Sequence, residues 1–236
     1  MHMKNAIITG ATKGIGRNIA EVMWREGYSL AVCARSEDDL RHMAEEFEST
    51  ESHQQFLWRP TDVSDTRDVE AFSDFVKDSW DVVDVLINNA GIFKPGEVLK
   101  EEEGLLDYML RTNLYSAYNL TRAIFPLLKK SKQAHVFTMC SIASIKAYPD
   151  GGAYTISKYA LLGFTKSLRE EMKPLGIKVT AVIAGATWSD SWKGVDYPES
   201  RMMQASDITE AVMSALRMSP SAVVEEILIR PQLGDL

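Results

Sequence analysis

Short apolar runs alternate along the chain with longer stretches in which apolar residues recur every three or four positions. Most of the short runs are continuously apolar, which is typical of parallel strands covered on both faces. They predict strands at 5–9, 29–34, 55–59, 84–88, 135–140, 178–183 and 226–230. The longer stretches predict helices near 15–26, 37–48, 66–79, 102–130, 153–173 and 207–218.

Seven strands that alternate with six helices imply right-handed crossovers between parallel strands. This pattern predicts an α/β fold with a doubly wound, seven-stranded parallel sheet and helices on both faces. We find no linker, repeat or low-complexity segment within the 236 residues. The sequence therefore predicts a single domain over 1–236.

A glycine-rich turn follows the first predicted strand. The segment TGATKGIG, residues 9–16, places Gly10, Gly14 and Gly16 between that strand and a helix. Glycines permit a tight turn and a close approach of the backbone, and the helix N-terminus offers unpaired N–H groups to a phosphate. A plain strand–helix turn is the alternative interpretation. The strand before and the helix after the turn favour a Rossmann-type nucleotide site.

The end of the second predicted strand indicates which dinucleotide this site prefers. NAD sites generally place an acidic residue there to hold the ribose 2′-hydroxyl. This chain has Ala34 instead, followed by Arg35, and Lys13 adds a second cation in the glycine turn. A guanidinium binds phosphate oxygens in a fork, so the pattern favours NADP(H) over NAD(H). Alternatively, both cations are ordinary solvated surface charges.

Four elements in a fixed order carry a family resemblance. They are TGATKGIG, NNAG at 88–91, a serine that closes the fifth strand, and YTISK at 154–158, thirteen residues beyond that serine. With them the chain resembles the short-chain dehydrogenase/reductase family in its compact single-domain form, over nearly its whole length. The resemblance implies four catalytic residues: Asn113, Ser141, Tyr154 and Lys158.

The resemblance also implies a set of cofactor contacts. Asn88 would lie beside a ribose, and Asp62-Val63 would flank the adenine ring. The family usually has a proline before Gly185, where this chain has Ala184, which loosens one constraint on the turn. The implied cofactor-binding residues are Gly10, Thr12, Lys13, Gly14, Ile15, Gly16, Arg35, Asp62, Val63, Asn88, Ala90, Gly91, Tyr154, Lys158, Gly185 and Thr187.

Tyr154 and Lys158 lie four residues apart, on one face of a predicted helix. A ketone that accepts hydride develops charge on its oxygen, which must be stabilised and protonated. We expect Lys158 and a positive nicotinamide ring to lower the pKa of the Tyr154 phenol; a shift of about 2–3 units takes about 3–4 kcal/mol. Ser141 would hold the substrate oxygen, and Asn113 would hold a water in a proton relay. Taken alone, the pair also fits an ordinary amphipathic helix.

Substrates of open α/β sheets bind at the carboxyl ends of the strands. We therefore expect substrate loops at about 142–152 and 187–205, which are rich in apolar and aromatic residues. This composition mildly favours an apolar or aromatic carbonyl compound, although a lid packed on the domain would look similar. The candidate substrate residues are Ser141, Ala143, Tyr148, Trp188 and Trp192.

Composition and charge bear on which partners, metals and cellular location we expect. A net charge of −7 and a pI of about 5.2 argue against a nucleic-acid surface, and no apolar run approaches a membrane span. Cys33 and Cys140 lack metal-ligand spacing, so we expect no metal. The chain enters a strand at once, so we expect no signal peptide and a cytoplasmic protein. The helices at 102–130 and 153–173 could pair with copies of themselves, as in the family's homodimers and homotetramers.

The sequence thus predicts an NADP(H)-dependent carbonyl reductase or alcohol dehydrogenase. It would transfer hydride between nicotinamide and a ketone or secondary alcohol. One alternative is a catalytically silent, NADPH-binding regulatory protein of the same fold, which would have no chemical need for all four catalytic residues. Another is a Rossmann-type methyltransferase, which would bind S-adenosylmethionine and leave Tyr154 and Lys158 unexplained.

Overall fold

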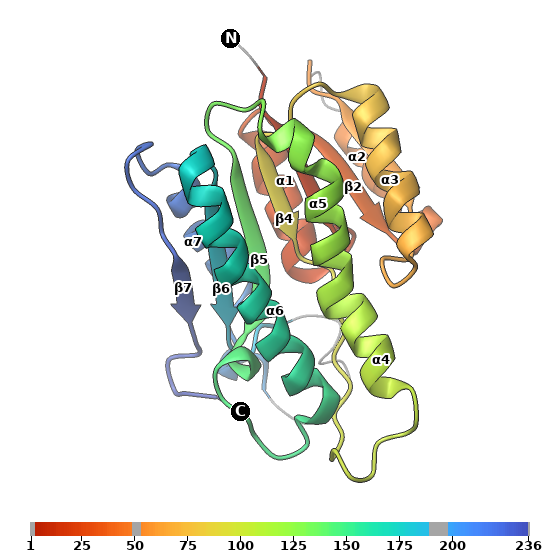
Figure 1. The fold of residues 1–236 in the computed structure, drawn as a ribbon, viewed down its shortest axis with the longest axis vertical. Coiled ribbons are helices and arrows are strands. Elements are labelled where there is room, and N and C mark those ends of the chain that lie inside the picture. The colour runs from red at the N-terminus through yellow and green to blue at the C-terminus, as the bar shows by residue number, and fades with distance from the viewer. Residues whose placement is uncertain (1–2, 49–52, 189–197, 236) are drawn as a thin grey trace.

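Seven parallel strands form one sheet in the computed structural model, in the order β3-β2-β1-β4-β5-β6-β7 (Figure 1). The structure describes residues 3–48, 53–188 and 198–235. All seven predicted strands are confirmed, with small shifts at their ends. They are β1 (Asn5–Thr9), β2 (Ser29–Ala34), β3 (Phe56–Pro60), β4 (Val85–Asn88), β5 (His135–Ser141), β6 (Lys178–Ala184) and β7 (Glu226–Ile229).

Helices cover both faces of the sheet. Apolar residues of α1, α2 and α7 pack on one face, and those of α3, α5 and α6 pack on the other. The doubly wound Rossmann fold is therefore confirmed. The α-helices are α1 (Gly14–Arg25), α2 (Glu37–Glu48), α3 (Thr66–Ser79), α4 (Leu105–Leu110), α5 (Ser116–Leu128), α6 (Gly152–Met172) and α7 (Ala205–Leu216).

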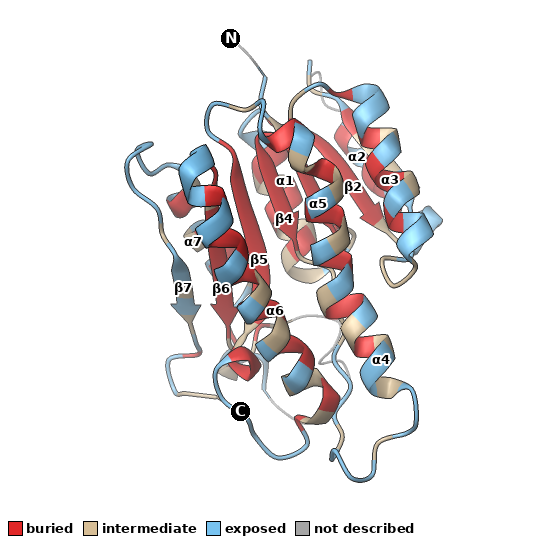
Figure 2. Cartoon of the chain, in the orientation of Figure 1, coloured by how far each residue is buried: buried red, intermediate tan, exposed pale blue. Residues whose placement is uncertain are grey.

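The burial pattern explains why most strands read as continuous apolar runs. Strand β4 is buried at every position and β1 at all but its first, since helices lie above and below them (Figure 2). Strand β7 alternates between exposed and partly buried residues because it forms an edge of the sheet. The hydrophobic core therefore lies on either side of the central strands, below the strand ends that carry the candidate site.

The single helix predicted over 102–130 is wrong in detail. The structure divides it into α4, a π-helical turn at Arg111–Tyr115, and α5. Asn113 lies in this turn and is 1% exposed. Its side-chain amide forms hydrogen bonds with both the N–H and the carbonyl of Ile92, and the widened turn accommodates these contacts. Helix α7 also begins two residues before the predicted 207, because Gln204 caps it and donates its N–H to Asp207 at 2.8 Å.

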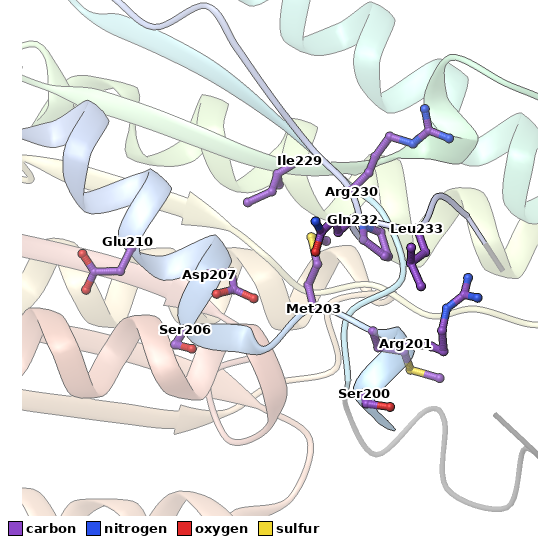
Figure 3. Close-up of a pocket in the computed structure, with 12 residues that line it drawn as sticks. Ser200, Arg201, Met203, Ser206, Asp207, Glu210, Ile229, Arg230, Gln232 and Leu233 are labelled. Atoms are coloured by element: carbon purple, nitrogen blue, oxygen red, sulfur yellow. The ribbon is translucent and has the colours of Figure 1, made fainter. Parts of the chain in front are cut away.

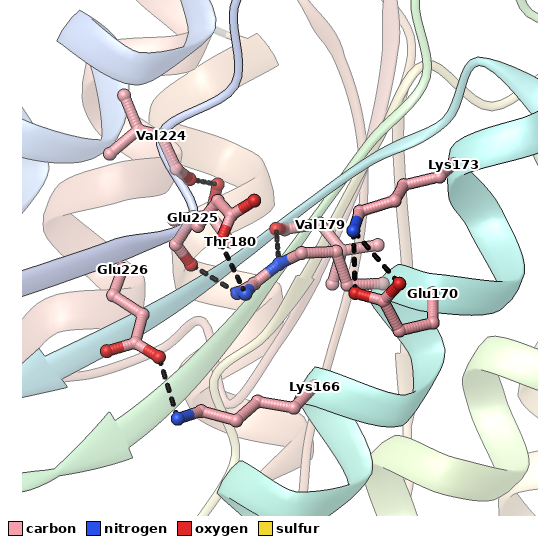
Figure 4. A network of polar contacts seen from close by, with 9 residues as sticks. Lys166, Glu170, Lys173, Val179, Thr180, Val224, Glu225 and Glu226 are labelled. Carbon is pink, nitrogen blue, oxygen red and sulfur yellow. Dashed lines mark hydrogen bonds and ion pairs between the residues drawn. The ribbon is translucent and has the colours of Figure 1, made fainter.

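Helix α6 is anchored to the sheet by a buried arginine, Arg169, which hydrogen-bonds with Val179 and Glu225, two of the residues labelled in Figure 4. Its Nε donates to the Val179 carbonyl of β6 at 3.1 Å. Its other nitrogens reach the carbonyl of Glu225 at 2.5 Å and the carboxylate of Glu225 at 3.2 Å, just before β7. A planar guanidinium suits this task, because it donates in several fixed directions at once. Arg169 therefore holds the C-terminal half of α6 against β6 and β7.

Candidate functional site

The glycine turn after β1 is shaped for a close approach of the backbone. Gly10 and Gly14 have φ of +64° and +55°, a backbone conformation that residues with a side chain rarely adopt. A Cβ at Gly16 would overlap the Asn89 side chain and the Gly10 carbonyl oxygen. The N-cap of α1, Lys13, makes no side-chain capping bond. The first N–H groups of this helix therefore have no side-chain acceptor at the N-cap, which is the arrangement that anion sites at helix N-termini use.

Asn89, the second residue of the NNAG segment, joins that segment to the glycine turn, although the implied cofactor contacts do not include it. Its Nδ2 donates to the carbonyls of Thr9 at 2.9 Å and Gly10 at 3.0 Å. In return, Thr9 Oγ1 accepts from the backbone N–H groups of Asn89 at 3.0 Å and Ala90 at 2.9 Å. The available signal was the motif itself, because β4 lies beside β1 in the sheet. Asn89 and Thr9 hold the two loops together.

Asn88 and Asp62 have local partners. Asn88 is 4% exposed, and its Nδ2 donates to Thr121 Oγ1 of α5 at 3.0 Å. The Oδ1 atom of Asn88 is buried and has no partner among the described residues. Asp62 is exposed and accepts from the N–H of Ser64 at 2.9 Å and from its hydroxyl at 2.7 Å. The Asn88 amide thus braces β4 against α5.

Two cations lie at the expected 2′-phosphate position. Arg35 is exposed just after β2 and makes no hydrogen bond or ion pair with the rest of the described chain. Lys13 pairs with Asp39 of α2, with Nζ and Oδ2 3.1 Å apart. The pair is largely exposed and therefore weak. Arg35 is the cation with its donors available to an anion.

Helix α6 presents Tyr154 and Lys158 together, as the four-residue spacing predicts. Lys158 is 6% exposed, and its Nζ lies 5.8 Å from the centroid of the Tyr154 ring. This ammonium donates to the Met139 carbonyl of β5 at 2.8 Å. Phe93 packs edge-on against the Tyr154 ring, with centroids 4.8 Å apart. The phenol thus lies between the β4–α4 segment and the end of β5.

The pKa of Tyr154 does not move in the expected direction. Burial raises the pKa of Tyr154, and a hydrogen bond with the Ser141 side chain offsets only part of that rise. Burial also lowers the pKa of Lys158, since the charged ammonium loses hydration. The expectation that Lys158 depresses the phenol's pKa is therefore not met by these residues alone. Desolvation is the largest influence on the pKa of this phenol.

Ser141 and Asn113 are both fixed by local hydrogen bonds. Ser141 Oγ accepts from the N–H of Ala143 at 3.1 Å, and its own N–H donates to Ser144 Oγ at 3.1 Å. Ala143 has no exposed surface, so its side chain offers none to a substrate. Asn113 Oδ1 accepts from Ile92 N at 2.7 Å. Its Nδ2 donates to Ile92 O at 3.0 Å and to Ser157 Oγ at 2.9 Å, so the side chain ties the loop after β4 to α6.

The expected substrate loops are described in part. Tyr148 is 38% exposed, and burial, with the neighbouring Tyr154 and Asp235, raises its pKa to about 12. Trp188 is partly buried, and its backbone N–H donates to the Met203 carbonyl at 2.8 Å. Trp192 lies outside the described residues.

The turn after β6 has Ala184 where the resemblance leads us to expect a proline. A Cβ at Gly185 would lie 2.9 Å from Pro231 Cδ, so the C-terminal segment packs tightly against this turn. Thr187 is 7% exposed, and its hydroxyl donates to the Gly185 carbonyl at 3.1 Å. These two contacts restrict the turn where Ala184 replaces the proline.

Two cavities lie near the strand ends. One, of about 570 Å³, lies between the start of α7, the end of β7 and the C-terminal segment (Figure 3). Its lining includes Met202 and Met203 of the expected substrate segment, but neither Tyr154 nor Ser141. The other, of about 660 Å³, is lined by 62–67 and by residues of α4 and α5, beside the segment expected at the adenine. Neither cavity contains the candidate catalytic residues.

The fold and site together define a Rossmann-type oxidoreductase. The family of short chain dehydrogenases matches residues 4–199. Sepiapterin reductase of Chlorobaculum tepidum is 31% identical over 238 residues, which cover 98% of this chain and 97% of that protein. The chain belongs to the short-chain dehydrogenase family.

Solved structures agree with this assignment. An alcohol dehydrogenase from the archaeon Thermococcus sibiricus, complexed with 5-hydroxy-NADP, superposes with a TM-score of 0.89 at 30% identity, covering 98% of this chain and 97% of that one. A metagenomic short-chain oxidoreductase in complex with NADP gives a TM-score of 0.83 at 27% identity, covering 97% of each chain. Within the described ranges, the structure contains no helix both long and apolar enough to cross a membrane.

Proposed function

We propose that the protein is an NADP(H)-dependent carbonyl reductase or alcohol dehydrogenase, which transfers hydride between nicotinamide and a ketone or secondary alcohol. The observation that carries the proposal is the meeting of Tyr154, Ser141 and Lys158 at the carboxyl end of β5. These side chains supply a proton donor, a hydroxyl that can hold a carbonyl oxygen, and an ammonium. A silent nucleotide-binding relative has no chemical use for this set.

The residues present fit a dinucleotide. A narrow glycine turn and the uncapped N-terminus of α1 would hold the pyrophosphate, and the backbone around Gly185 and Thr187 would face the nicotinamide. Arg35, with its guanidinium exposed, would bind a 2′-phosphate. The two solved relatives complexed with NADP or its 5-hydroxy form support this preference.

Each catalytic side chain has a distinct task. The bound cofactor supplies the hydride. The Ser141 hydroxyl would hold the substrate oxygen, and the Tyr154 hydroxyl would give it a proton as charge develops there. Lys158 donates one N–H to the Met139 carbonyl, so its two other N–H groups remain as donors for a ribose hydroxyl or a water. Asn113 would keep the loop after β4 in place beside α6.

Tyr148 and Trp188 support an apolar or aromatic carbonyl substrate. Sepiapterin belongs in the test panel, because a relative that aligns over nearly the whole chain is a sepiapterin reductase. We further propose a homodimer or homotetramer, since α5 and α6 expose Tyr118 and Tyr159 at 41% and 45%. An acidic single-domain enzyme of this kind suits the cytoplasm.

The test is a panel of aryl ketones, aliphatic ketones and sepiapterin with NADPH, followed by loss of NADPH absorbance. Tyr154→Phe should bind NADPH like the parent and lose at least about 100-fold in kcat. Tyr159→Phe, on the exposed side of the same helix, is the matched control and should react like the parent. Tight NADPH binding without turnover on any carbonyl would instead favour the silent regulator. Full activity of Tyr154→Phe would remove the acid role.

A further inference from the structure

The segment between β4 and α4, residues 89–104, folds against the first turn of α6. Phe93 contacts the Tyr154 ring, as described above. Gly96 donates its N–H to the Asp150 carbonyl at 2.8 Å. Glu101 Oε1 accepts from the N–H of Ala153 at 2.8 Å. These three contacts join the segment to the residues around the candidate proton donor, although Glu101 and Ala153 are 52 positions apart in the chain.

Glu101 supplies a cap that α6 lacks locally. The N-cap of α6 is Gly151, which has no side chain to accept from the first N–H groups of the helix. Such groups need an acceptor, and a carboxylate there also suits the positive end of the helix dipole. The N–H that Glu101 accepts belongs to Ala153, the residue directly before Tyr154. A displacement of Glu101 would therefore shift the backbone at Ala153 and, through the next peptide unit, the Tyr154 side chain.

The surrounding backbone leaves room for this carboxylate. A Cβ on Gly152 would overlap Glu101 Oε1, and a Cβ on Gly96 would lie 2.8 Å from Glu101 Cγ. Asp150, with φ of 58°, is the one non-glycine residue of the described chain with positive φ. A non-glycine residue persists in this conformation when its surroundings hold it there. Gly96 and Gly152 thus form a tight fit around Glu101, which an ordinary solvated carboxylate does not require, and Asp150 holds Gly96 through its carbonyl.

We propose that Glu101 is a positioning residue for proton transfer. Its carboxylate oxygen fixes the first turn of α6, and that turn holds the Tyr154 hydroxyl beside Ser141. The inference rests on the proposed role of Tyr154 as the acid. Its magnitude follows from the sensitivity of such reactions to geometry, because a misplacement of about 1 Å can cost about 100-fold in rate.

Two conservative variants separate the effect of the length of the Glu101 side chain from the effect of its charge. Glu101→Gln keeps an acceptor oxygen at the same distance and removes the charge, whereas Glu101→Asp keeps the charge and loses the reach. We expect Glu101→Gln to retain kcat within about 3-fold, and Glu101→Asp to lose about 10- to 100-fold in kcat. The KM for NADPH should stay near the parent value, and the melting temperature of Glu101→Asp should fall by only about 2–4 °C, as expected for the loss of one helix cap. Glu102→Asp, an exposed neighbour without a capping bond, is the matched control and should leave kcat unchanged.

The measurements are kcat and KM for the best ketone of the panel, NADPH affinity and thermal unfolding of each full-length variant. An Asp variant as fast as the parent, or faster than the Gln variant, would overturn the proposal. A loss of kcat in the Asp variant together with a loss of NADPH affinity and a larger fall in melting temperature would also overturn it, because that result indicates a purely structural role. Tyr154→Phe, assayed alongside, separates a failure of the acid role of Tyr154 from a failure of the positioning role of Glu101. If it stays active, the acid assignment fails regardless of Glu101.

Discussion

Acidification from pH 7 to 4.5 should protonate His135 in the unfolded chain but not in the folded protein. The imidazole is 2% exposed and stacks on Phe137 with ring centroids 4.0 Å apart. Its Nε2 lies 2.7 Å from Thr180 Oγ1, and that hydroxyl donates to the Val224 carbonyl. The neutral ring therefore donates through Nε2 to Thr180. Burial, together with the charge of Lys178, lowers the pKa of His135 to about 3.

The sign of the effect follows from proton binding. The folded pKa of His135 lies below the unfolded value of 6.5, so the unfolded chain binds more protons as the pH falls through this window. Stability from this group is complete above about pH 6.5 and is lost progressively down to about pH 3. The loss amounts to about 1 kcal/mol at pH 5.5 and about 3 kcal/mol at pH 4.5. For a domain of this size, the larger loss lowers the melting temperature by about 6–12 °C.

Urea unfolding of the parent and two variants at pH 7, 5.5 and 4.5 measures how the free energy of unfolding changes with pH. His135→Gln should be less stable at pH 7 by about 1–3 kcal/mol, because its buried amide is incompletely bonded. It should, however, lose about 3 kcal/mol less than the parent between pH 7 and 4.5. His42→Gln, an exposed site on α2, should follow the parent. Equal pH slopes for the parent and His135→Gln would refute the reasoning, since other groups would then carry the acid effect.

Three further predictions concern the cofactor site and the anchor of α6. Arg35→Asp should shift the ratio of kcat/KM for NADPH over NADH by at least about 10-fold toward NADH, and an unchanged ratio would contradict a 2′-phosphate contact. Asn89→Ala should weaken NADPH binding about 10-fold, because the glycine turn loses two hydrogen bonds; titration by fluorescence measures it. Arg169→Met should cost about 2–4 kcal/mol of stability in urea, since the Val179 and Glu225 carbonyls lose their donor; a change below 1 kcal/mol would refute this role.

The sheet was predictable because burial on both faces leaves an unambiguous mark on sequence. Strands such as β1 and β4 are apolar at nearly every position, and the glycine turn follows the first of them directly. The π-helical turn at Asn113 was not predictable from periodicity, since one widened turn changes the apolar repeat too little. Glu101 was missed for a different reason. Its partner lies far along the chain, and a run of three acidic residues gives no sign of which one caps α6.

The direction of the Tyr154 pKa bears on which reaction the site favours. A donor must carry its proton at working pH, and burial keeps the phenol protonated by raising its pKa. Reduction of a carbonyl needs this form, whereas oxidation of an alcohol needs the phenolate. The hydrogen bond with the Ser141 side chain lowers the pKa of the phenol, but by less than burial raises it. The protonated phenol suits the donor role proposed for reduction, and the phenolate needed for oxidation would form only toward alkaline pH.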